Sequence, residues 1–255
     1  MMQAYSYSTD MELDESLRQK VAAYKPSPEA LRPIRRAPLL LLVGITGAGK
    51  DAILQQLLAT YPTDYRYILS HITRPRRENN GVMEQEGVEY HFIDFAEANR
   101  MLDAGEYIEA NIVHHEHIYG TSIKEVKSIY NEGKIALTDV TIDGADDYVR
   151  LGLNAKPVFL LPPSYAIWKQ RLMKREGNMD PTYYKHRLRS ALREIKHALS
   201  KPHFYIVIND QLSTTAELVN SIGHDERVEP HFHKAVEIAE QLLVELKHEL
   251  STLDA

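Results

Sequence analysis

The stretch that most constrains the fold is residues 39–58, where an apolar run leads into a glycine-rich loop and then a helical pattern. Leu39–Val43 has the length and composition of a buried strand. The loop reads Gly-x-x-x-x-Gly-Lys over 44–50, and apolar residues then recur at helical spacing over 53–58. A strand, a glycine loop and a helix in this order form the context that a P-loop requires.

This loop predicts a binding site for a nucleoside triphosphate. Glycines let successive backbone N–H groups converge on phosphate oxygens, and the N-terminus of the next helix adds its positive dipole end. A lysine at the end of the loop supplies a mobile charge to the outer phosphates. The residues expected to contact the phosphates are Gly44, Ile45, Thr46, Gly47, Ala48, Gly49, Lys50 and Asp51.

Residue 51 departs from the standard motif. A Ser or Thr normally holds Mg²⁺ at this position, whereas this chain has Asp51 followed by Ala52, so no neighbouring hydroxyl replaces it. Hard Mg²⁺ accepts carboxylate ligands, so Asp51 can hold the metal. The same negative charge can instead repel the phosphates and weaken binding. Both outcomes stay open at the level of sequence.

Length and charge exclude several classes of protein. A chain of 255 residues suits one α/β domain with extensions, or two small domains. The net charge of −6 provides no basic field for nucleic acid or anionic lipid. The absence of cysteine excludes disulfides, thiolate nucleophiles and thiolate metal sites. Because residues 1–20 are acidic without an apolar core, and no apolar run has membrane-spanning length, we expect a soluble, cytoplasmic protein without membrane partners.

Two terminal segments read as extensions. In residues 1–37, Asp10 is predicted to cap a short helix whose apolar positions run over 13–24, and the segment is expected to form a packed arm. Residues 223–255 begin as a polar linker and continue as a long amphipathic helix. This helix must bury its apolar stripe on its own core or on another chain, so a homo-oligomer is one of two expectations.

Three arginines in four residues follow a predicted second strand, Tyr65–Ser70. Arg74, Arg76 and Arg77 flank Pro75, which fixes the turn. Guanidinium forks suit the doubly charged phosphate of a monophosphate better than lysines do. The segment is therefore either a phosphate site or a solvated basic loop.

From this point onward the chain resembles guanylate kinases. That family reads Ser-x-Thr-Thr-Arg-x-x-Arg, Gly-x-x-Tyr-x-Phe, Glu-Phe-x-Glu and Tyr-Tyr-Gly-Thr/Ser, in this order after a P-loop. This chain reads Ser-His-Ile-Thr-Arg-Pro-Arg-Arg over 70–77, Gly-Val-Glu-Tyr-His-Phe over 87–92, Glu-Tyr-Ile-Glu over 106–109 and Ile-Tyr-Gly-Thr over 118–121. Each motif alone is weak evidence for the resemblance, but four motifs in the family's order are strong evidence together.

The resemblance covers about residues 38–222 and implies an α/β P-loop kinase fold. We expect a parallel sheet flanked by helices, a small β-rich GMP-binding subdomain at about 70–121, and a helical lid at about 171–187. The terminal segments lie outside this domain.

The resemblance also implies a site for GMP. Two arginines and two tyrosine hydroxyls would hold its phosphate. Glu109 would accept hydrogen bonds from the N1–H and the exocyclic amine of guanine, whereas adenine presents a bare acceptor at N1 and is rejected. Ser70 and Thr121 would read O6 and the ring edge. The expected GMP-binding residues are Ser70, Arg74, Arg77, Tyr90, Glu109, Tyr119 and Thr121.

A metal site is expected where a strand ends at Asp139. In the family a strand here ends with Asp-x-Asp, whereas this chain reads Asp-Val-Thr over 139–141. Asp139 would hold Mg²⁺ through water, beside Asp51. Thr141 stands in place of the second Asp and weakens the transfer of any contact that the family assigns to it.

The expected lid follows a buried strand, Pro157–Leu161. Arg171 and Arg175 share one helix face, and Arg187 lies on a second helix. Without the P-loop they would read as solvated charges, but the resemblance makes them lid arginines that stabilise the charge of the transferring phosphoryl group and exclude water. Together with Lys50 they are the expected catalytic residues. Asn209, at the end of the last predicted strand, is expected near the adenine of ATP.

Three functions compete at this stage. The first is Mg²⁺- and ATP-dependent phosphorylation of GMP and dGMP in purine nucleotide metabolism, which explains the P-loop, the arginine pair, both tyrosines, Glu109 and the lid. The second is a kinase for another small acceptor, such as ribose 1,5-bisphosphate; those enzymes share Gly-Lys-Asp but usually have Ser or Thr where this chain has Ala52. The third is a weakened or non-catalytic nucleotide- or protein-binding module, a class that tends to lose the P-loop and lid charges kept here. We favour the first.

Overall fold

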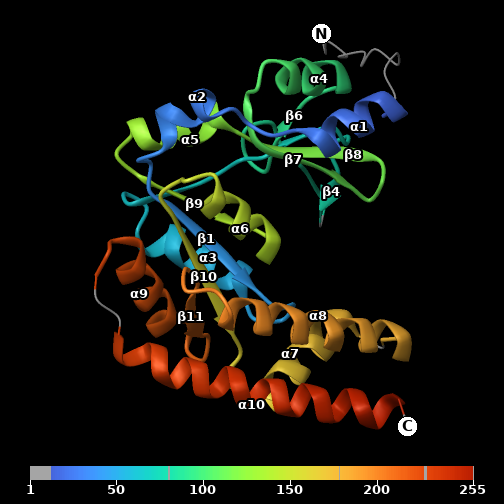
Figure 1. Ribbon diagram of the computed structural model, residues 1–255, viewed down its shortest axis with the longest axis vertical. Helices are drawn as coiled ribbons and strands as arrows, with labels where there is room; N and C mark the ends of the chain where they lie inside the picture. Colours follow the sequence, from blue (N-terminus) through green and yellow to red (C-terminus); the bar gives the residue numbers. More distant parts are fainter. Residues whose placement is uncertain (1–12, 80, 178, 227–228, 255) are drawn as a thin grey trace. The chain divides into compact units, whose positions relative to one another are not determined.

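The described chain forms two compact units. One, here called the acceptor unit, contains the described residues up to Arg36 together with Ile68–Glu132; the other, the P-loop unit, contains Ala37–Tyr67 together with Gly133–Ala255 (Figure 1). The arginine-rich segment lies in the acceptor unit and the glycine loop in the P-loop unit. The computed structural model describes residues 13–79, 81–177, 179–226 and 229–254.

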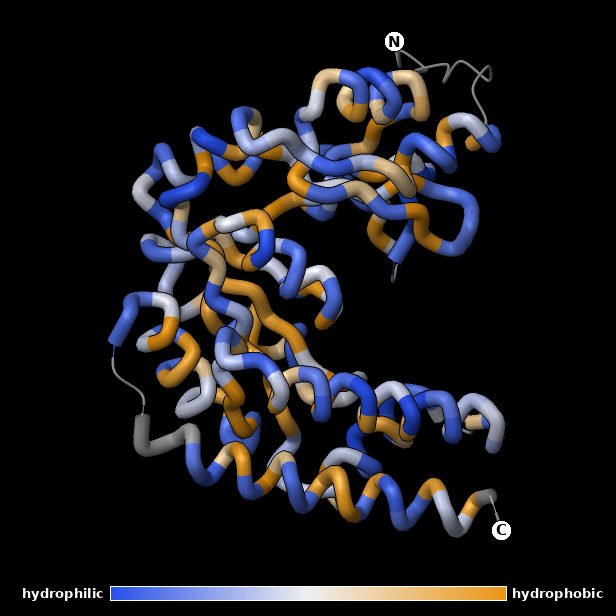
Figure 2. Tube along the Cα trace, viewed as in Figure 1, coloured by the Kyte–Doolittle hydropathy of each residue, from blue (hydrophilic) through white to orange (hydrophobic). Residues whose placement is uncertain are grey.

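The described part of the P-loop unit contains a five-stranded sheet in which every pairing is parallel. Its strand order is β11 (Tyr205–Ile208), β10 (Ala155–Leu161), β1 (Leu39–Gly44), β9 (Ile135–Asp139) and β2 (Tyr65–Tyr67). The central strand β1 is buried along its whole length, as its unbroken apolar run predicts for a strand covered on both faces (Figure 2). The predicted parallel α/β fold is confirmed.

Helices flank this sheet. They are α3 (Lys50–Thr60), α6 (Ile142–Arg150), α7 (Tyr165–Glu176), α8 (Pro181–Leu199), α9 (Leu212–Gly223) and α10 (Glu229–Asp254). Helix α3 leaves the glycine loop and packs against α9, whereas α6 packs against β1, β10 and α8. These contacts position the helix that follows the loop, and α8, which carries Arg187.

The C-terminal helix α10 covers its apolar stripe within the chain. Ala235, Ala239, Leu242 and Leu246 are buried, and α10 packs along β11, α8 and α7 (Figure 1). The first of the two sequence expectations, burial on its own core, therefore accounts for this stripe, and a homo-oligomer formed through α10 stays a prediction. No helix in the described part of the chain is long and apolar enough to cross a membrane.

Among the described residues, the acceptor unit has a four-stranded mixed sheet and a two-stranded hairpin. The sheet order is β6 (His91–Phe92), β3 (His71–Ile72), β8 (His117–Ser122) and β7 (Tyr107–Val113), and the hairpin pairs β4 (Glu78–Asn79) with β5 (Val82–Met83). The helical segments are α1 (Glu15–Ala23), α2 (Pro28–Leu31), the 3₁₀ helix η1 (Arg32–Ile34), α4 (Phe95–Asp103) and α5 (Ile123–Asn131). Helix α1 packs against β7 and α4.

Two details differ from the sequence expectations. Helix α1 begins at Glu15, with Asp14 as its N-cap accepting from Leu17 N at 2.7 Å; Asp10, the predicted cap, lies outside the described residues. The predicted strand over 65–70 was wrong in its second half, because β2, which pairs with β9, ends at Tyr67, where the chain passes into the acceptor unit.

Candidate active site

The glycine loop has the tight backbone that phosphate binding requires. Gly44, Gly47 and Gly49 have φ angles of 147°, 84° and 90°, which residues with a Cβ rarely adopt. A Cβ at Gly44 would lie 2.5 Å from Leu160 O, and one at Gly49 would lie 2.4 Å from the side-chain amide of Asn209. Glycine is therefore required at these positions by the neighbouring atoms as well as by the turn.

Two side chains anchor the loop through its carbonyl groups. The Trp168 indole N–H donates to Thr46 O at 2.9 Å, and the Asn209 amide donates to Ala48 O at 2.8 Å. Both side chains are buried. Asn209, which the sequence analysis expected near adenine, thus supports the loop backbone. Trp168 was missed, since a tryptophan on an amphipathic helix reads as an ordinary core residue.

The side chain of Lys50 is hydrogen-bonded to the backbone of the loop. Its ammonium group donates to Gly44 O at 2.7 Å. Burial lowers the pKa of Lys50, and the nearby carboxylates of Asp139, Glu194 and Asp51 oppose this by raising it. Glu194 lies on α8 and accepts a hydrogen bond from a serine one turn earlier. Sequence reasoning gave no role to this glutamate.

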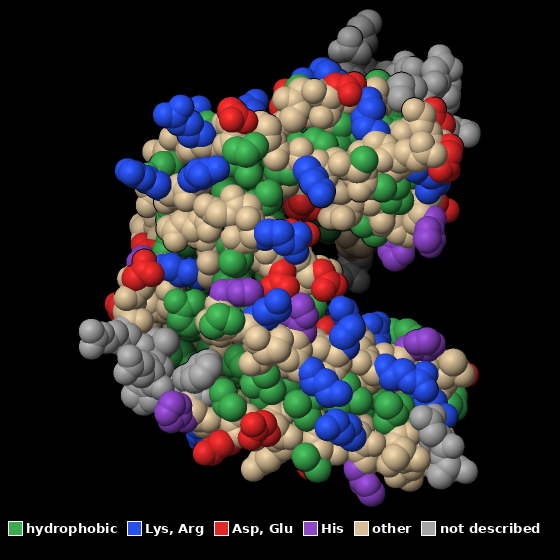
Figure 3. Space-filling view, in the orientation of Figure 1, with side chains coloured by type: hydrophobic (Ala, Val, Ile, Leu, Met, Phe, Trp, Pro, Cys, Tyr) green, Lys and Arg blue, Asp and Glu red, His purple; other side chains and the backbone are tan. Residues whose placement is uncertain are grey.

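The structure brings the three expected lid arginines to the loop and its neighbours. Arg171 donates to Asn209 O at 3.1 Å, and Arg187 donates to Thr46 Oγ1 at 3.4 Å. Arg175 is 60% exposed and lies 4.0 Å from a carboxylate oxygen of Asp51. Figure 3 shows lysine and arginine side chains gathered on the surface over α8. The P-loop unit therefore presents a lysine and three arginines around one glycine loop.

The donors present suit a magnesium ion. Asp51 is 75% exposed in the first turn of α3, and the exposed Asp139 ends β9 and accepts from Tyr67 OH at 3.1 Å. Within the described ranges no three His, Asp or Glu side chains form a ready metal cluster. Mg²⁺ usually takes one or two carboxylates and completes its shell with phosphates and water. Thr141 caps α6 by accepting from Gly144 N at 3.1 Å, so it serves the helix.

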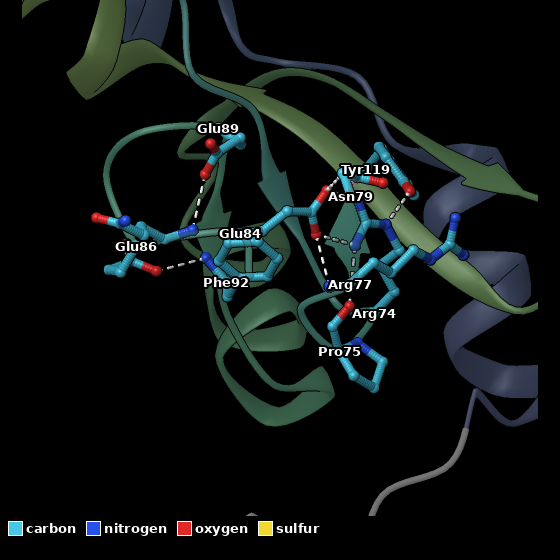
Figure 4. Close-up of polar contacts among 10 residues, drawn as sticks. Arg74, Pro75, Arg77, Asn79, Glu84, Glu86, Glu89, Phe92 and Tyr119 are labelled. Atoms are coloured by element: carbon cyan, nitrogen blue, oxygen red, sulfur yellow. Dashed lines mark hydrogen bonds and ion pairs between the residues drawn. The ribbon is translucent and has the colours of Figure 1, made fainter. Parts of the chain in front are cut away.

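In the acceptor unit, Arg74 is bound by a partner that the sequence analysis missed. Its two terminal nitrogens donate to the Glu84 carboxylate at 2.6 and 2.8 Å, and its Nε donates to Tyr119 OH at 2.9 Å (Figure 4). Both members of the ion pair are about 95% buried. The hydrogen bonds from Arg74 lower the pKa of Glu84 to about 2, and Glu84 in turn raises the pKa of Arg74. No local pattern marks Glu84 among the four glutamates of residues 78–89.

The other expected phosphate contacts surround this pair. The Arg74 guanidinium lies 5.2 Å from the centre of the Tyr90 ring, and the rings of Tyr90 and Tyr119 are 6.1 Å apart, edge to face. Arg77 has an exposed side chain, and its backbone N–H donates to Glu84 at 2.8 Å. Glu84 therefore binds the side chain of Arg74 and the backbone of Arg77.

The expected base-reading residues lie on neighbouring strands. Glu109 on β7 faces Thr121 on β8, and the Thr121 hydroxyl donates to its carboxylate at 2.8 Å. The Asn111 amide donates to the other carboxylate oxygen. Ser70 directly precedes β3, where His71 is opposite Gly120. The structure thus brings Ser70, Glu109 and Thr121 to adjacent strands and adds Asn111, which lies two residues along the same strand face.

Comparisons with known proteins agree with this geometry. The family model described as "Guanylate kinase" matches residues 36–226. The chain is 31% identical to "Guanylate kinase 1" of Arabidopsis thaliana over 211 residues, covering 82% of this chain and 52% of the relative. It is 31% identical to "Guanylate kinase 1" of Oryza sativa subsp. japonica over 179 residues, covering 70% and 45%. The chain therefore spans about half the length of these two plant relatives.

Shorter relatives match over most of their length. The chain is 32% identical to the guanylate kinase of Thermotoga maritima over 192 residues, covering 75% of this chain and 88% of the relative. The crystal structure of guanylate kinase from Anaplasma phagocytophilum shares the fold, with a TM-score of 0.53, 23% identity, and coverage of 75% of this chain and 86% of that chain. On these matches and on its own motifs, the chain belongs to the guanylate kinase family.

Proposed function

We propose that this chain transfers the γ-phosphoryl group of ATP to GMP or dGMP. A phosphate oxygen of the acceptor attacks the γ-phosphorus, the bond from that phosphorus to the bridging oxygen breaks, and ADP leaves. The observation that carries the proposal is the pairing of Glu109 with Thr121 in a unit that also presents Arg74, Tyr90 and Tyr119. Family membership supports it.

The chemistry of the acceptor unit favours a guanine nucleotide. A carboxylate held by Thr121 and Asn111 is an acceptor for the N1–H and amine of guanine, and it would face an unprotonated nitrogen in adenine. A ribosyl phosphate acceptor would not need such a reader. A binding module would not need the lysine and arginines at the glycine loop. The two alternatives therefore explain fewer of the residues.

The phosphate of GMP would bind hydroxyl groups as well as positively charged side chains. A guanidinium has five N–H donors, and within the described structure four of those on Arg74 are already used, three of them by Glu84 and Tyr119. Because the Tyr119 hydroxyl accepts from Arg74, its own proton can be donated to the phosphate, together with that of Tyr90. The exposed Arg77 would supply most of the remaining positive charge.

The P-loop unit would stabilise the transferring group. Lys50 would exchange its bond to Gly44 O for the phosphates, and the lid arginines would meet the charge that spreads over the equatorial oxygens. The ion pair between Arg175 and Asp51 is long and exposed, so it holds the arginine weakly. Asp51 and Asp139 would hold Mg²⁺, which would neutralise negative charge on the phosphates. A cytoplasmic location belongs to this proposal.

Glu109→Gln tests the base-reading step. The amide would present a donor where guanine also donates, so GMP affinity and turnover are expected to fall by roughly 10- to 100-fold, with ATP affinity unchanged. Glu106→Gln is the matched control, because this nearby glutamate pairs with Arg100 on the surface. Calorimetric titration of each nucleotide separates the outcomes. Equal loss of ATP and GMP binding in Glu109→Gln would contradict the proposal.

A further inference from the structure

Helix α1 lies outside residues 36–226, which match the family model, yet it forms part of the acceptor unit. Leu17 and Val21 of α1 are buried in the same cluster as Tyr107 of β7 and Ile118 of β8. The strands that carry the expected base-reading residues therefore share their core with a segment beyond the family region.

The contact between α1 and β7 includes one specific polar interaction. Tyr24, the C-cap of α1, donates from its hydroxyl to Tyr107 O at 2.7 Å and accepts from Tyr107 N at 3.0 Å. The two rings also meet edge to face, with centroids 6.2 Å apart. Because β7 ends the strand order of its sheet, none of the strands that the structure describes lies on that side to pair with these two backbone groups. The hydroxyl of Tyr24 takes the place of such a strand.

Tyr107 stands at a change of register between β7 and β8. Tyr107 is opposite Ser122, but Glu109 is opposite Thr121, so β7 has one extra residue at this point. Continued without the bulge, the first register would place Glu109 opposite Gly120. Bulges re-aim side chains in this way. The bulge is therefore what sets Glu109 against the Thr121 hydroxyl, 2.8 Å away.

The residue before the bulge is held from both sides. The Tyr107 ring is completely buried, and a Cβ at Gly120 would lie 2.6 Å from it, so the ring fills the space beside β8. The backbone of Tyr107 is held by Tyr24 on the opposite, outer edge. A strand edge without such a partner can shift by one residue, and a slip of one residue moves each side chain to the other face of the sheet.

We propose that Tyr24 is a positioning residue for guanine recognition: its hydroxyl holds Tyr107 in the register that sets Glu109 opposite Thr121. Tyr24 does not itself touch the nucleotide. The inference rests on the proposed function, because it takes Glu109 and Thr121 to read guanine. It makes the specificity of the acceptor site depend on a helix outside the family region.

Tyr24→Phe in the full chain removes the hydroxyl and keeps the ring packing. GMP is expected to bind about threefold to tenfold more weakly, the effect of one or two net hydrogen bonds. IMP lacks the exocyclic amine, so its binding depends less on Glu109. The affinity for IMP is therefore expected to change less than the affinity for GMP. The ratio of GMP to IMP affinity should fall. ATP affinity should not change. Calorimetric titrations measure all three.

Lys20→Ala is the matched control on the same helix. It removes the bonds from Lys20 to Asn99 and Asp103 on α4 and leaves the contact with β7 intact. This variant should keep the wild-type ratio of GMP to IMP affinity. Hydrogen exchange adds a direct readout, since the Tyr107 amide is expected to exchange faster in Tyr24→Phe but not in Lys20→Ala.

Equal weakening of GMP and IMP in Tyr24→Phe would overturn the inference, because it would mean a merely structural role. An unchanged affinity ratio or an unchanged Tyr107 exchange rate would overturn it too. These results would leave the proposed function standing if the wild-type chain binds GMP. Failure of the wild-type chain to bind GMP would instead refute the proposed function and, with it, the inference.

Discussion

Glu84→Gln is expected to destabilise the acceptor unit by about 3 kcal/mol. Glu84 has its pKa lowered from 4.5 to about 2, chiefly by its hydrogen bonds with Arg74. This is a fall of about 2.5 pH units, and each unit corresponds to about 1.4 kcal/mol. Removing one partner of a buried ion pair costs about 3–5 kcal/mol, a similar magnitude, because the remaining charge is left buried.

The pH dependence of the same pair has a definite sign. Glu84 has a lower pKa in the folded chain than its ordinary 4.5, so its contribution is fully present above that pH and is lost as the pH falls toward about 2. As the pH falls from 4.5 to about 2, the free energy of unfolding of the wild-type acceptor unit should therefore decrease by about 3 kcal/mol more than that of Glu84→Gln. Above it, the difference between the two should be constant.

Urea unfolding monitored by two probes measures the loss of stability and shows which unit it affects. Circular dichroism reports both units, whereas the fluorescence of Trp168, the chain's one tryptophan, reports the P-loop unit. Glu86→Gln is the matched control, because Glu86 has an exposed side chain and its hydrogen bonds go to His91 and Phe92; it should cost less than about 1 kcal/mol. Equal stability of Glu84→Gln and Glu86→Gln would refute the reasoning.

Two further changes test the P-loop unit. Asp51→Ala is expected to raise the Mg²⁺ concentration for half-maximal rate about tenfold, because it removes a carboxylate ligand. Titration of the rate with Mg²⁺ measures this concentration. An unchanged or lower value would mean that Asp51 does not hold the metal. Trp168→Phe removes the indole bond to Thr46 O and should raise the KM for ATP about threefold to tenfold while leaving GMP affinity unchanged. A wild-type KM for ATP in steady-state kinetics would show that the loop keeps its shape without this bond.

The parts of the molecule that were predicted correctly depend on neighbours in the sequence. Strand β1, the turn at Gly44 and helix α3 follow from an apolar run, glycines and helical spacing within 39–58. Local pattern is sufficient where local geometry decides the structure.

The parts that were missed depend on contacts between distant residues. Trp168 reaches a carbonyl 122 positions away, and Tyr24 reaches Tyr107 across 83 positions. The burial of Glu84 and the bulge before Glu109 are likewise properties of the packed sheet. Thr141 did carry a local signal, since Thr before a helix is a common N-cap.

Parallel assays of ADP release with Mg-ATP test the central claim most directly. The acceptors are GMP, dGMP, AMP, CMP, UMP and ribose 1,5-bisphosphate, each at the same concentration. The account predicts turnover with GMP and dGMP and none with the others, because only guanine donates to the Glu109 carboxylate through both N1–H and its amine. Turnover with ribose 1,5-bisphosphate alone, or with AMP as readily as with GMP, would contradict it.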